Sequence, residues 1–151
     1  MLYRTAYSIL RNEADAEDVL QTIFFRLLRR KVPADVHRNV KGYLYRAAIN
    51  QSLNIVRMRQ RQELIADAKR FEVPVEAVDS DSAEEMEKRL AEAIAELHPE
   101  AAHILILRYI HSYSDADIAK LLGTSRGTIA VRLFRSRARL KKLMRDSLGE
   151  K

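Results

Sequence analysis

Apolar residues recur at helical spacing from the start of the chain up to about Arg61. A first helix is predicted to end near Asn12, and Asp15 is the predicted N-cap of a second one. A long third helix is expected from Val40 to about Arg61. The stripes that predict these helices are Leu2, Ala6, Ile9 and Leu10, then Val19, Leu20, Ile23, Phe24, Leu27 and Leu28, then Leu44, Ala48, Ile49, Leu53 and Val56. Pro33 interrupts the pattern, so residues 32–39 are expected to form a loop.

An acidic stretch follows this first group of helices. No Lys or Arg lies between Phe71 and Glu87, while Pro74 and the run Asp-Ser-Asp-Ser break any helical pattern. The acidic residues are Glu72, Glu76, Asp79, Asp81, Glu84, Glu85 and Glu87. Such composition is typical of a flexible linker, which we place at residues 63–82 between modules at residues 1–62 and 83–151.

The second module is predicted to contain four helices. Ser82 and Glu85 have the spacing of a capping box, and Pro99 suits the first turn of the next helix. Ser114 is expected to cap a short third helix that ends near Leu122, where Gly123 suits the left-handed position after a helix. Thr124 or Ser125 then begins a last helix that runs to about Met144. The fold class is therefore all-α, with two helical modules joined by a flexible acidic linker.

The last two helices have the pattern of a helix-turn-helix. The residues that would join them in a core are Ile118, Ala119, Leu122, Ile129 and Leu133. The last helix carries no acidic residue between Arg126 and Arg145, but it carries Arg132, Arg135, Arg137, Arg139, Lys141 and Lys142. A solvated helix face normally mixes charges of both signs, so this run indicates contact with nucleic acid. Arg126 and Thr128 are expected near base edges and the later cations near phosphates or a protein partner.

Composition narrows the classes of function. The 151 residues carry a net charge of +6, with 47% hydrophobic residues and no cysteine, so disulfides and thiolate metal sites are excluded and a cytoplasmic location is expected. We find no apolar run of about 18 residues, which a membrane span would need. The four histidines lack the spacing of a metal site, and no Gly-rich phosphate loop is present, so we expect no enzyme activity, metal or cofactor.

Two stretches carry a family resemblance. "ADAEDVLQTIFFRLLRR", followed by "NVKGYLYRAAINQSLNIVRMRQRQ", resembles the second conserved region of bacterial sigma-70-family sigma factors. "LHPEAAHILILRYIHSYSDADIAKLLGTSRGTIAVRLFRSRARLKKL" resembles their fourth region. The layout, with no domain between these regions, is similar to the extracytoplasmic-function (ECF) group. This chain starts inside what resembles the first helix of the first module, whereas family members usually carry about one more helix before that point.

The resemblance implies roles for residues of the first module. Asp18, Gln21 and Phe24 match the D-x-x-Q-x-x-F positions that dock on the clamp helices of the polymerase β′ subunit, although Phe24 also lies on the apolar stripe and is expected in the core. Unstacked bases of the −10 element would be captured by the segment at residues 32–39 and the helix after it. The implied −10 contacts are His37, Arg38, Asn39, Tyr43, Tyr45, Asn50, Arg57, Arg59 and Arg61. One of the two tyrosines is expected in the core, and Asn50, which matches R-x-A-x-N, is expected to hold the loop or to touch DNA.

The resemblance also implies roles for the second module, which would bind the −35 duplex and the flap tip of the polymerase β subunit. The implied −35 contacts are Arg126, Thr128, Ala130, Val131, Arg132, Arg135, Arg137 and Arg139. Where the family pattern in this helix is roughly G-T-V-K-S-R, Ala130 and Val131 replace Lys and Ser. The preferred −35 sequence therefore does not transfer from other members.

Two other classes of function remain open at this point. A helix-turn-helix regulator that acts without polymerase would need dimer contacts to recognise two half-sites. A protein-interaction module would place the basic helix on an acidic partner and show no DNA affinity. A sigma factor instead binds core RNA polymerase and promoter DNA, and the resemblance adds an anti-sigma factor as a partner.

Overall fold

Helices make up nearly all of the part of the chain that the structure describes. The computed structural model describes residues 1–30, 32–70 and 82–149, and no strand occurs among them. The helices are α1 Leu2–Leu10, α2 Glu13–Arg29, α3 Ala34–Arg38, α4 Val40–Lys69, α5 Ala83–Ala95, α6 Pro99–Tyr109, α7 Asp115–Leu122 and α8 Arg126–Ser147. The predicted all-α class is confirmed. Across the described residues, no helix is both long and apolar enough to cross a membrane.

Polar side chains cap most of these helices. Ser82, Ser114 and Ser125 accept bonds from the backbone N–H groups three residues ahead, as the sequence predicts for the first two. The predicted cap at Asp15 is wrong, because Asn12 caps α2 and its Oδ1 accepts from Asp15 N at 2.9 Å. Asp15 instead lies in the first turn, where its carboxylate suits the helix dipole.

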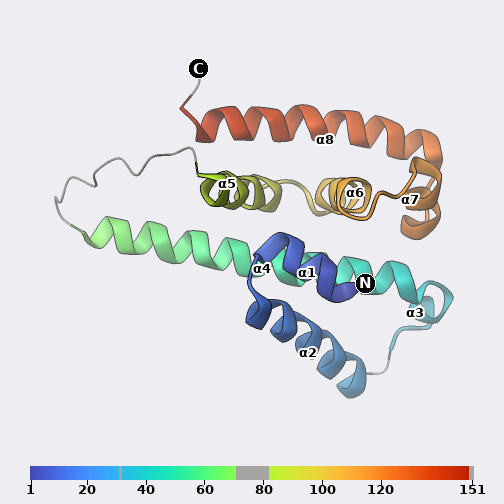
Figure 1. Ribbon diagram of the computed structural model, residues 1–151. Helices are drawn as coiled ribbons and strands as arrows, with labels where there is room; N and C mark the ends of the chain where they lie inside the picture. Colours follow the sequence, from blue (N-terminus) through green and yellow to red (C-terminus); the bar gives the residue numbers. More distant parts are fainter. Residues whose placement is uncertain (31, 71–81, 150–151) are drawn as a thin grey trace.

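The first module packs α1, α2 and α4 around one core. Ala6, Val19, Ile23, Ala48 and Ile49 are fully buried there. Small residues at Ala6 and Ala48 allow α1 and α4 to approach closely, and α1 lies across α4 in Figure 1. This core fixes which faces of α2 and α4 point outward.

Two segments differ from the sequence prediction. Residues 34–38, expected to be loop, form the short helix α3, since Pro33 suits a helix N-terminus and Asn39 ends that helix while capping the next. The helix predicted to end near Arg61 continues to Lys69. Strong helix formers such as Leu64, Ala66 and Lys69 follow Arg61, so α4 persists although Val56 is its last buried residue. The rest of the predicted linker, residues 71–81, lies outside the described residues.

The second module is a four-helix unit, as predicted. Ile104, Leu107, Ile118, Ile129 and Leu133 form its buried core, which joins α6, α7 and α8. Gly123 ends α7 in the left-handed region with φ of 70°, where a side chain would be strained. The short turn after it sets α8 against α6 and α7.

The two modules pack against each other, and each contributes to the core of the other. Ala95, Ala102 and Ile106 of the second module belong to the buried cluster of the first, while Tyr45 of α4 belongs to the cluster of the second. In Figure 1, α4 runs beneath α5 and α6, and α8 lies on the far side of the molecule from α2. The two expected DNA-binding elements therefore have different surroundings: α4 lies at the module boundary and α8 at the outside.

Candidate nucleic-acid interface

The start of α8 is fixed by its cap. Ser125 Oγ accepts from Thr128 N at 3.2 Å and lies 2.8 Å from Thr128 Oγ1. The Thr128 hydroxyl, a predicted base contact, thus already has a partner within the cap. Arg126 is exposed at the first position of the helix, where the chain leaves the turn.

The outer face of α8 combines exposed apolar groups with cations. Val131 and Phe134 are 51% and 74% exposed, and Ala130 lies beside them. Ile129, Leu133 and Ser136 point the other way and are buried. The exposed cations of the helix are Arg126, Arg135, Arg137, Arg139, Lys141, Lys142 and Arg145.

Two of the arginines predicted to bind the −35 element contact α6. Arg132 Nη1 pairs with Glu100 Oε2 at 2.7 Å. The Arg137 guanidinium lies 5.5 Å from the ring centroid of Tyr109 and donates to its hydroxyl. Arg135 and Arg139 point to solvent and present their charges on the outer side of the helix. The structure therefore divides the predicted cations into those held against α6 and those that face outward.

The residues predicted to contact the −10 element on α4 lie largely against the second module. Asn39 Nδ2 donates to Leu121 O at 2.7 Å, and its Oδ1 accepts from Gly42 N at 3.0 Å. Tyr45 is fully buried, with its hydroxyl 2.9 Å from that of Tyr113. Burial and this bond raise the pKa of the Tyr45 phenol, so the group stays protonated.

The same contact continues along α4. Arg46, which the sequence analysis did not single out, donates to Leu122 O at 2.8 Å, and Arg57 donates to Ala95 O at 2.8 Å. Leu121 and Leu122 end α7, where carbonyl groups lack partners within the helix. Side chains of α4 supply those partners, and the Arg46 charge suits the negative end of the α7 dipole.

The remaining predicted −10 residues are more accessible. His37 and Arg38 are exposed at the end of α3, and Arg61 is exposed on α4. Tyr43 is half-buried and lines a groove of 630 Å³ together with Arg26, Leu27, Arg30, Val32 and Pro33. Arg59 forms an ion pair with Asp15. The tyrosine pair thus divides as expected, with Tyr45 in the core and Tyr43 beside an open groove.

The outward face of α2 is more apolar than its role as a surface helix requires. Phe24, Phe25 and Leu28 are 52%, 59% and 83% exposed, and Asp18 and Gln21 are exposed on the same helix. The prediction of Phe24 in the core is therefore wrong, because α1 and α4 cover only the side of α2 that carries Val19 and Ile23. Sequence reasoning missed Phe25 and Leu28 as surface residues. The signal was an apolar band on α2 wider than one face can bury.

Two histidines lie at the module boundary. His103 is buried on α6, and its Nε2 donates to Asn50 Oδ1 at 2.8 Å. Burial, with Arg46 nearby, lowers the pKa of His103 to about 4, so the ring is neutral near pH 7. His111 Nε2 lies 2.8 Å from Thr5 Oγ1, and burial lowers its pKa too. His103 is thus a buried residue whose side chain links α6 to α4.

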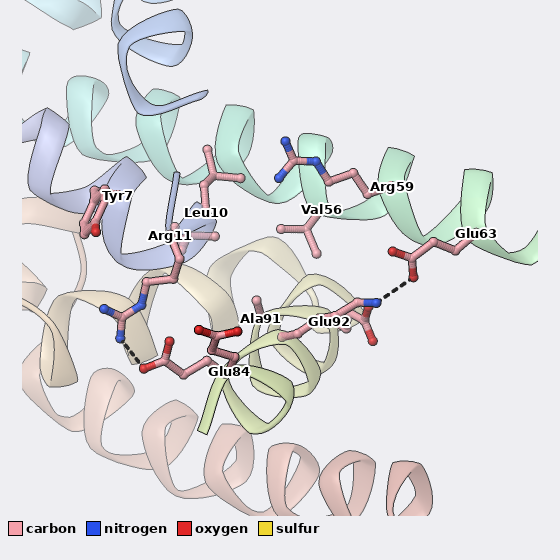
Figure 2. A pocket seen from close by; sticks show the side chains of 12 residues that line it. Tyr7, Leu10, Arg11, Val56, Arg59, Glu63, Glu84, Ala91 and Glu92 are labelled. Carbon is pink, nitrogen blue, oxygen red and sulfur yellow. Dashed lines mark hydrogen bonds and ion pairs between the residues drawn. The ribbon is translucent and has the colours of Figure 1, made fainter. Parts of the chain in front are cut away.

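A charged pocket of 640 Å³ opens where α1, α4 and α5 meet (Figure 2). Arg11 pairs with Glu87 at 2.8 Å and Lys88 with Glu63 at 2.9 Å, and each pair joins the two modules. All four side chains are about half exposed, so each pair contributes little to stability. No cluster of His, Cys, Asp or Glu with metal-binding geometry occurs in this pocket or elsewhere among the described residues.

Comparison with known proteins assigns each module. The family model for Sigma-70 region 2 matches residues 1–62, and that for Sigma-70 region 4 matches residues 87–140. The "RNA polymerase sigma-E factor" of Streptomyces avermitilis is 31% identical over 93% of this chain and 76% of that protein. The chain belongs to the sigma-70 family.

Further sigma-70-family relatives cover nearly all of the chain. The "ECF RNA polymerase sigma factor SigW" of Bacillus subtilis is 26% identical over 96% of this chain and 83% of its own length. Among solved structures, the sigma factor RpoE of Bartonella quintana, in complex with the anti-sigma factor NepR, matches with a TM-score of 0.50 and 23% identity. That match covers 95% of this chain and 89% of the other and supports the fold.

The family assignment places the α4 surface in region 2 and the α8 surface in region 4. The region 2 match ends at residue 62, within α4, and the region 4 match begins inside α5. The α4 face that lies against the second module is thus part of region 2. The outer face of α8 is part of region 4.

Proposed function

We propose that this chain is an ECF sigma factor that binds core RNA polymerase and directs it to promoters. The observation that carries this is the presence of both family regions in order, region 2 on the first helical module and region 4 on the second. Relatives named as ECF sigma factors, which align along almost the whole chain, support it. The chain forms no bond itself, since polymerase makes the phosphodiester linkages, and it acts with polymerase in the cytoplasm.

Within this function, three surfaces have separate tasks. The outward face of α2, with Asp18, Gln21 and Phe24, binds the clamp helices of the β′ subunit. An apolar groove of 610 Å³ between α5, α6 and α8, lined by Leu105, Tyr109 and Met144 among others, suits the flap tip of the β subunit. The exposed face of α8 binds the −35 duplex through the cations that point outward.

Binding of the −10 element requires a change in the module contact. Asn39, Tyr45 and Asn50 have partners in the second module, so their side chains are not free for bases in this conformation. Since base capture needs open pockets and stacking faces, we infer that the modules separate when core polymerase binds. An anti-sigma factor, by analogy with the complexed relative, would act on the same equilibrium.

In vitro transcription tests this proposal. Core polymerase from the source organism is combined with the chain on a library of genomic promoter fragments, and transcript starts are sequenced. We expect starts that depend on the chain, preceded by shared motifs near −10 and −35. A control with core polymerase alone should lack them, and absence of chain-dependent starts from an active core would overturn the proposal.

Binding of promoter duplexes in the absence of polymerase distinguishes a sigma factor from the alternative, a helix-turn-helix regulator. A helix-turn-helix regulator would bind specific promoter duplexes tightly by itself. An ECF sigma factor with the −10 face engaged by its own second module should bind them weakly until core polymerase is added. Tight specific binding without core polymerase, together with no stimulation by it, would favour the regulator.

A further inference from the structure

The part of α8 that points away from the molecule carries an apolar stripe with no structural partner. Phe134 is 74% exposed and Val131 is 51% exposed, so neither residue supports the core. Ala130 and Ala138 are exposed at helical spacing on the same face. The core of the module is built from the opposite face, by Ile129 and Leu133 among others.

Cations flank this stripe on both sides. With 100° between successive residues, Arg135 and Lys142 lie to one side of the stripe, and Arg126 and Arg137 lie to the other, where Arg137 also contacts Tyr109 of α6. An apolar strip between two rows of positive charge matches a duplex groove, in which phosphates border the edges of the bases. A purely apolar protein surface would not use the flanking charges, so their arrangement favours DNA over a hydrophobic protein partner.

Two polar groups near the start of α8 are already engaged within the chain, whereas Arg126 at the first position is exposed. The Thr128 hydroxyl interacts with Ser125, and Arg132 pairs with Glu100 at 2.7 Å. The side chains left at the centre of the exposed face carry only methyl and phenyl groups. They cannot exchange hydrogen bonds with base edges, so any sequence preference that they confer depends on apolar contact.

In the major groove, thymine is the base whose edge carries an apolar group, its C5-methyl. We propose that Ala130, Val131 and Phe134 recognise thymine methyl groups in the −35 duplex, an inference that rests on the proposed function. Along the helix axis these residues span about 6 Å. Base pairs are about 3.4 Å apart, so the stripe covers about two neighbouring steps. The preferred −35 element should therefore contain a short run of thymines facing this stripe.

Replacement of thymine by deoxyuridine, which lacks only the methyl group, tests this directly. Holoenzyme assembled from the full chain and core polymerase first selects its −35 element from promoter duplexes randomised at that element. The selected element is then synthesised with thymine or deoxyuridine at each position of the run. We expect binding to weaken by about fourfold for each methyl group removed from the contacted positions. Deoxyuridine in the spacer between the elements is the control and should change nothing.

Variants of the stripe identify the residues that recognise the methyl groups. Val131→Ser and Phe134→Ala should reduce the preference for thymine over deoxyuridine, and both positions are too exposed for these changes to unfold the module. Arg135→Ala should weaken binding to both duplexes equally, because a phosphate contact is insensitive to the methyl group. Leu148→Ala, beyond the end of α8, is the matched apolar control and should leave the preference intact.

The outcomes separate the two proposals. Selection of an element without a thymine run, or equal binding of thymine and deoxyuridine duplexes, would overturn methyl recognition and leave the sigma-factor function standing. A thymine preference that survives both stripe variants would also overturn it. Holoenzyme that selects no promoter and starts no transcript would instead overturn the proposed function.

Discussion

A hydrogen bond between the side chains of Asn50 and His103 is one of the contacts that join the two modules. His103 is buried, and its Nε2 depends on Asn50 Oδ1, 2.8 Å away. A buried donor without a partner costs more than the bond itself contributes, because the group loses water as well. This pair therefore gives Asn50 a structural role between the modules, whereas its match to a family motif indicated a role in the loop or in DNA contact.

Asn50→Ala should lower the free energy of unfolding by about 1–3 kcal/mol, the cost of leaving a buried polar group unpaired. Urea denaturation followed by circular dichroism measures it. Gln62→Ala, an exposed change on the same helix, is the control and should shift stability by less than about 0.5 kcal/mol. A similar small shift for both variants would mean that Asn50 does not support His103.

His103 also predicts a dependence of stability on pH. Its pKa falls from 6.5 to about 4 on folding, with burial as the main cause, Arg46 and His98 acting in the same direction and Glu100 against it. The neutral ring is thus favoured in the folded state. Its contribution is fully present above pH 6.5 and is lost as the pH falls from 6.5 towards 4, by up to about 3 kcal/mol.

His103→Gln should remove this component. Burial also raises the pKa of the Glu92 carboxyl, so protonation of Glu92 stabilises the folded chain as the pH falls, opposite to the effect of His103. The informative quantity is therefore the difference in stability between the variant and the unmodified chain. Unfolding free energies measured between pH 7 and 4.5 should fall more steeply for the unmodified chain. Parallel curves of unfolding free energy against pH for the two proteins would show that His103 does not cause this pH dependence.

At the scale of a helix, α2 shows how an apolar pattern can exceed what the fold buries. Val19 and Ile23 face the core, while Phe24, Phe25 and Leu28 lie on the exposed side. An exposed apolar patch of this kind marks a binding surface, which we propose is for core polymerase. Its two outermost members were not among the residues inferred from the family motif.

Leu28→Ser should weaken binding to core polymerase by about tenfold, which corresponds to about 1.4 kcal/mol. Fluorescence anisotropy of the labelled chain, titrated with core polymerase, measures the change. Leu64→Ser on α4 is the matched control, because that leucine is also strongly exposed but lies far along the helix from α2. Equal effects of the two variants, or no effect from either, would show that this face of α2 does not bind core polymerase.

At the scale of the molecule, the contact between α4 and α7 covers the surface that we propose for the −10 element and leaves the outer face of α8 open. Gly42 marks its closest approach: a Cβ atom at this position would lie 2.4 Å from Leu121 O and 2.6 Å from Asn39 Nδ2. The carbonyl is backbone and ends a helix, so it cannot turn aside as a flexible side chain would. Glycine is thus required for the modules to dock in this way.

Gly42→Ala should push the modules apart while leaving their helices intact. We expect a larger radius of gyration by small-angle scattering, unchanged helix content by circular dichroism, and stronger binding of a single-stranded −10 oligonucleotide. Gly127→Ala is the matched control, since a Cβ there would meet nothing within 4 Å. An unchanged radius together with unchanged oligonucleotide binding would show that this contact does not hold the −10 face.

The sequence by itself determined the local structure and the family of this protein. Helical periodicity, the capping serines, Pro99 and Gly123 act within a few residues of their positions in the chain, so they predict most helices and the helix-turn-helix turn. The charge on α8 and the two family motifs are likewise local in sequence. Both can be identified from the sequence without knowing which residues pack against them.

Only the tertiary structure decided how the modules meet and which side chains remain free. Phe24 lies on a predicted apolar stripe and Tyr45 lies outside the stripe predicted for its helix, yet Phe24 is exposed and Tyr45 is buried, because burial depends on which helix packs opposite. The bond between Asn39 and Leu121 joins positions 82 residues apart, and no local pattern encodes such a pair. Residue types therefore indicated what each helix could bind, and packing determined which of those groups already have partners within the chain.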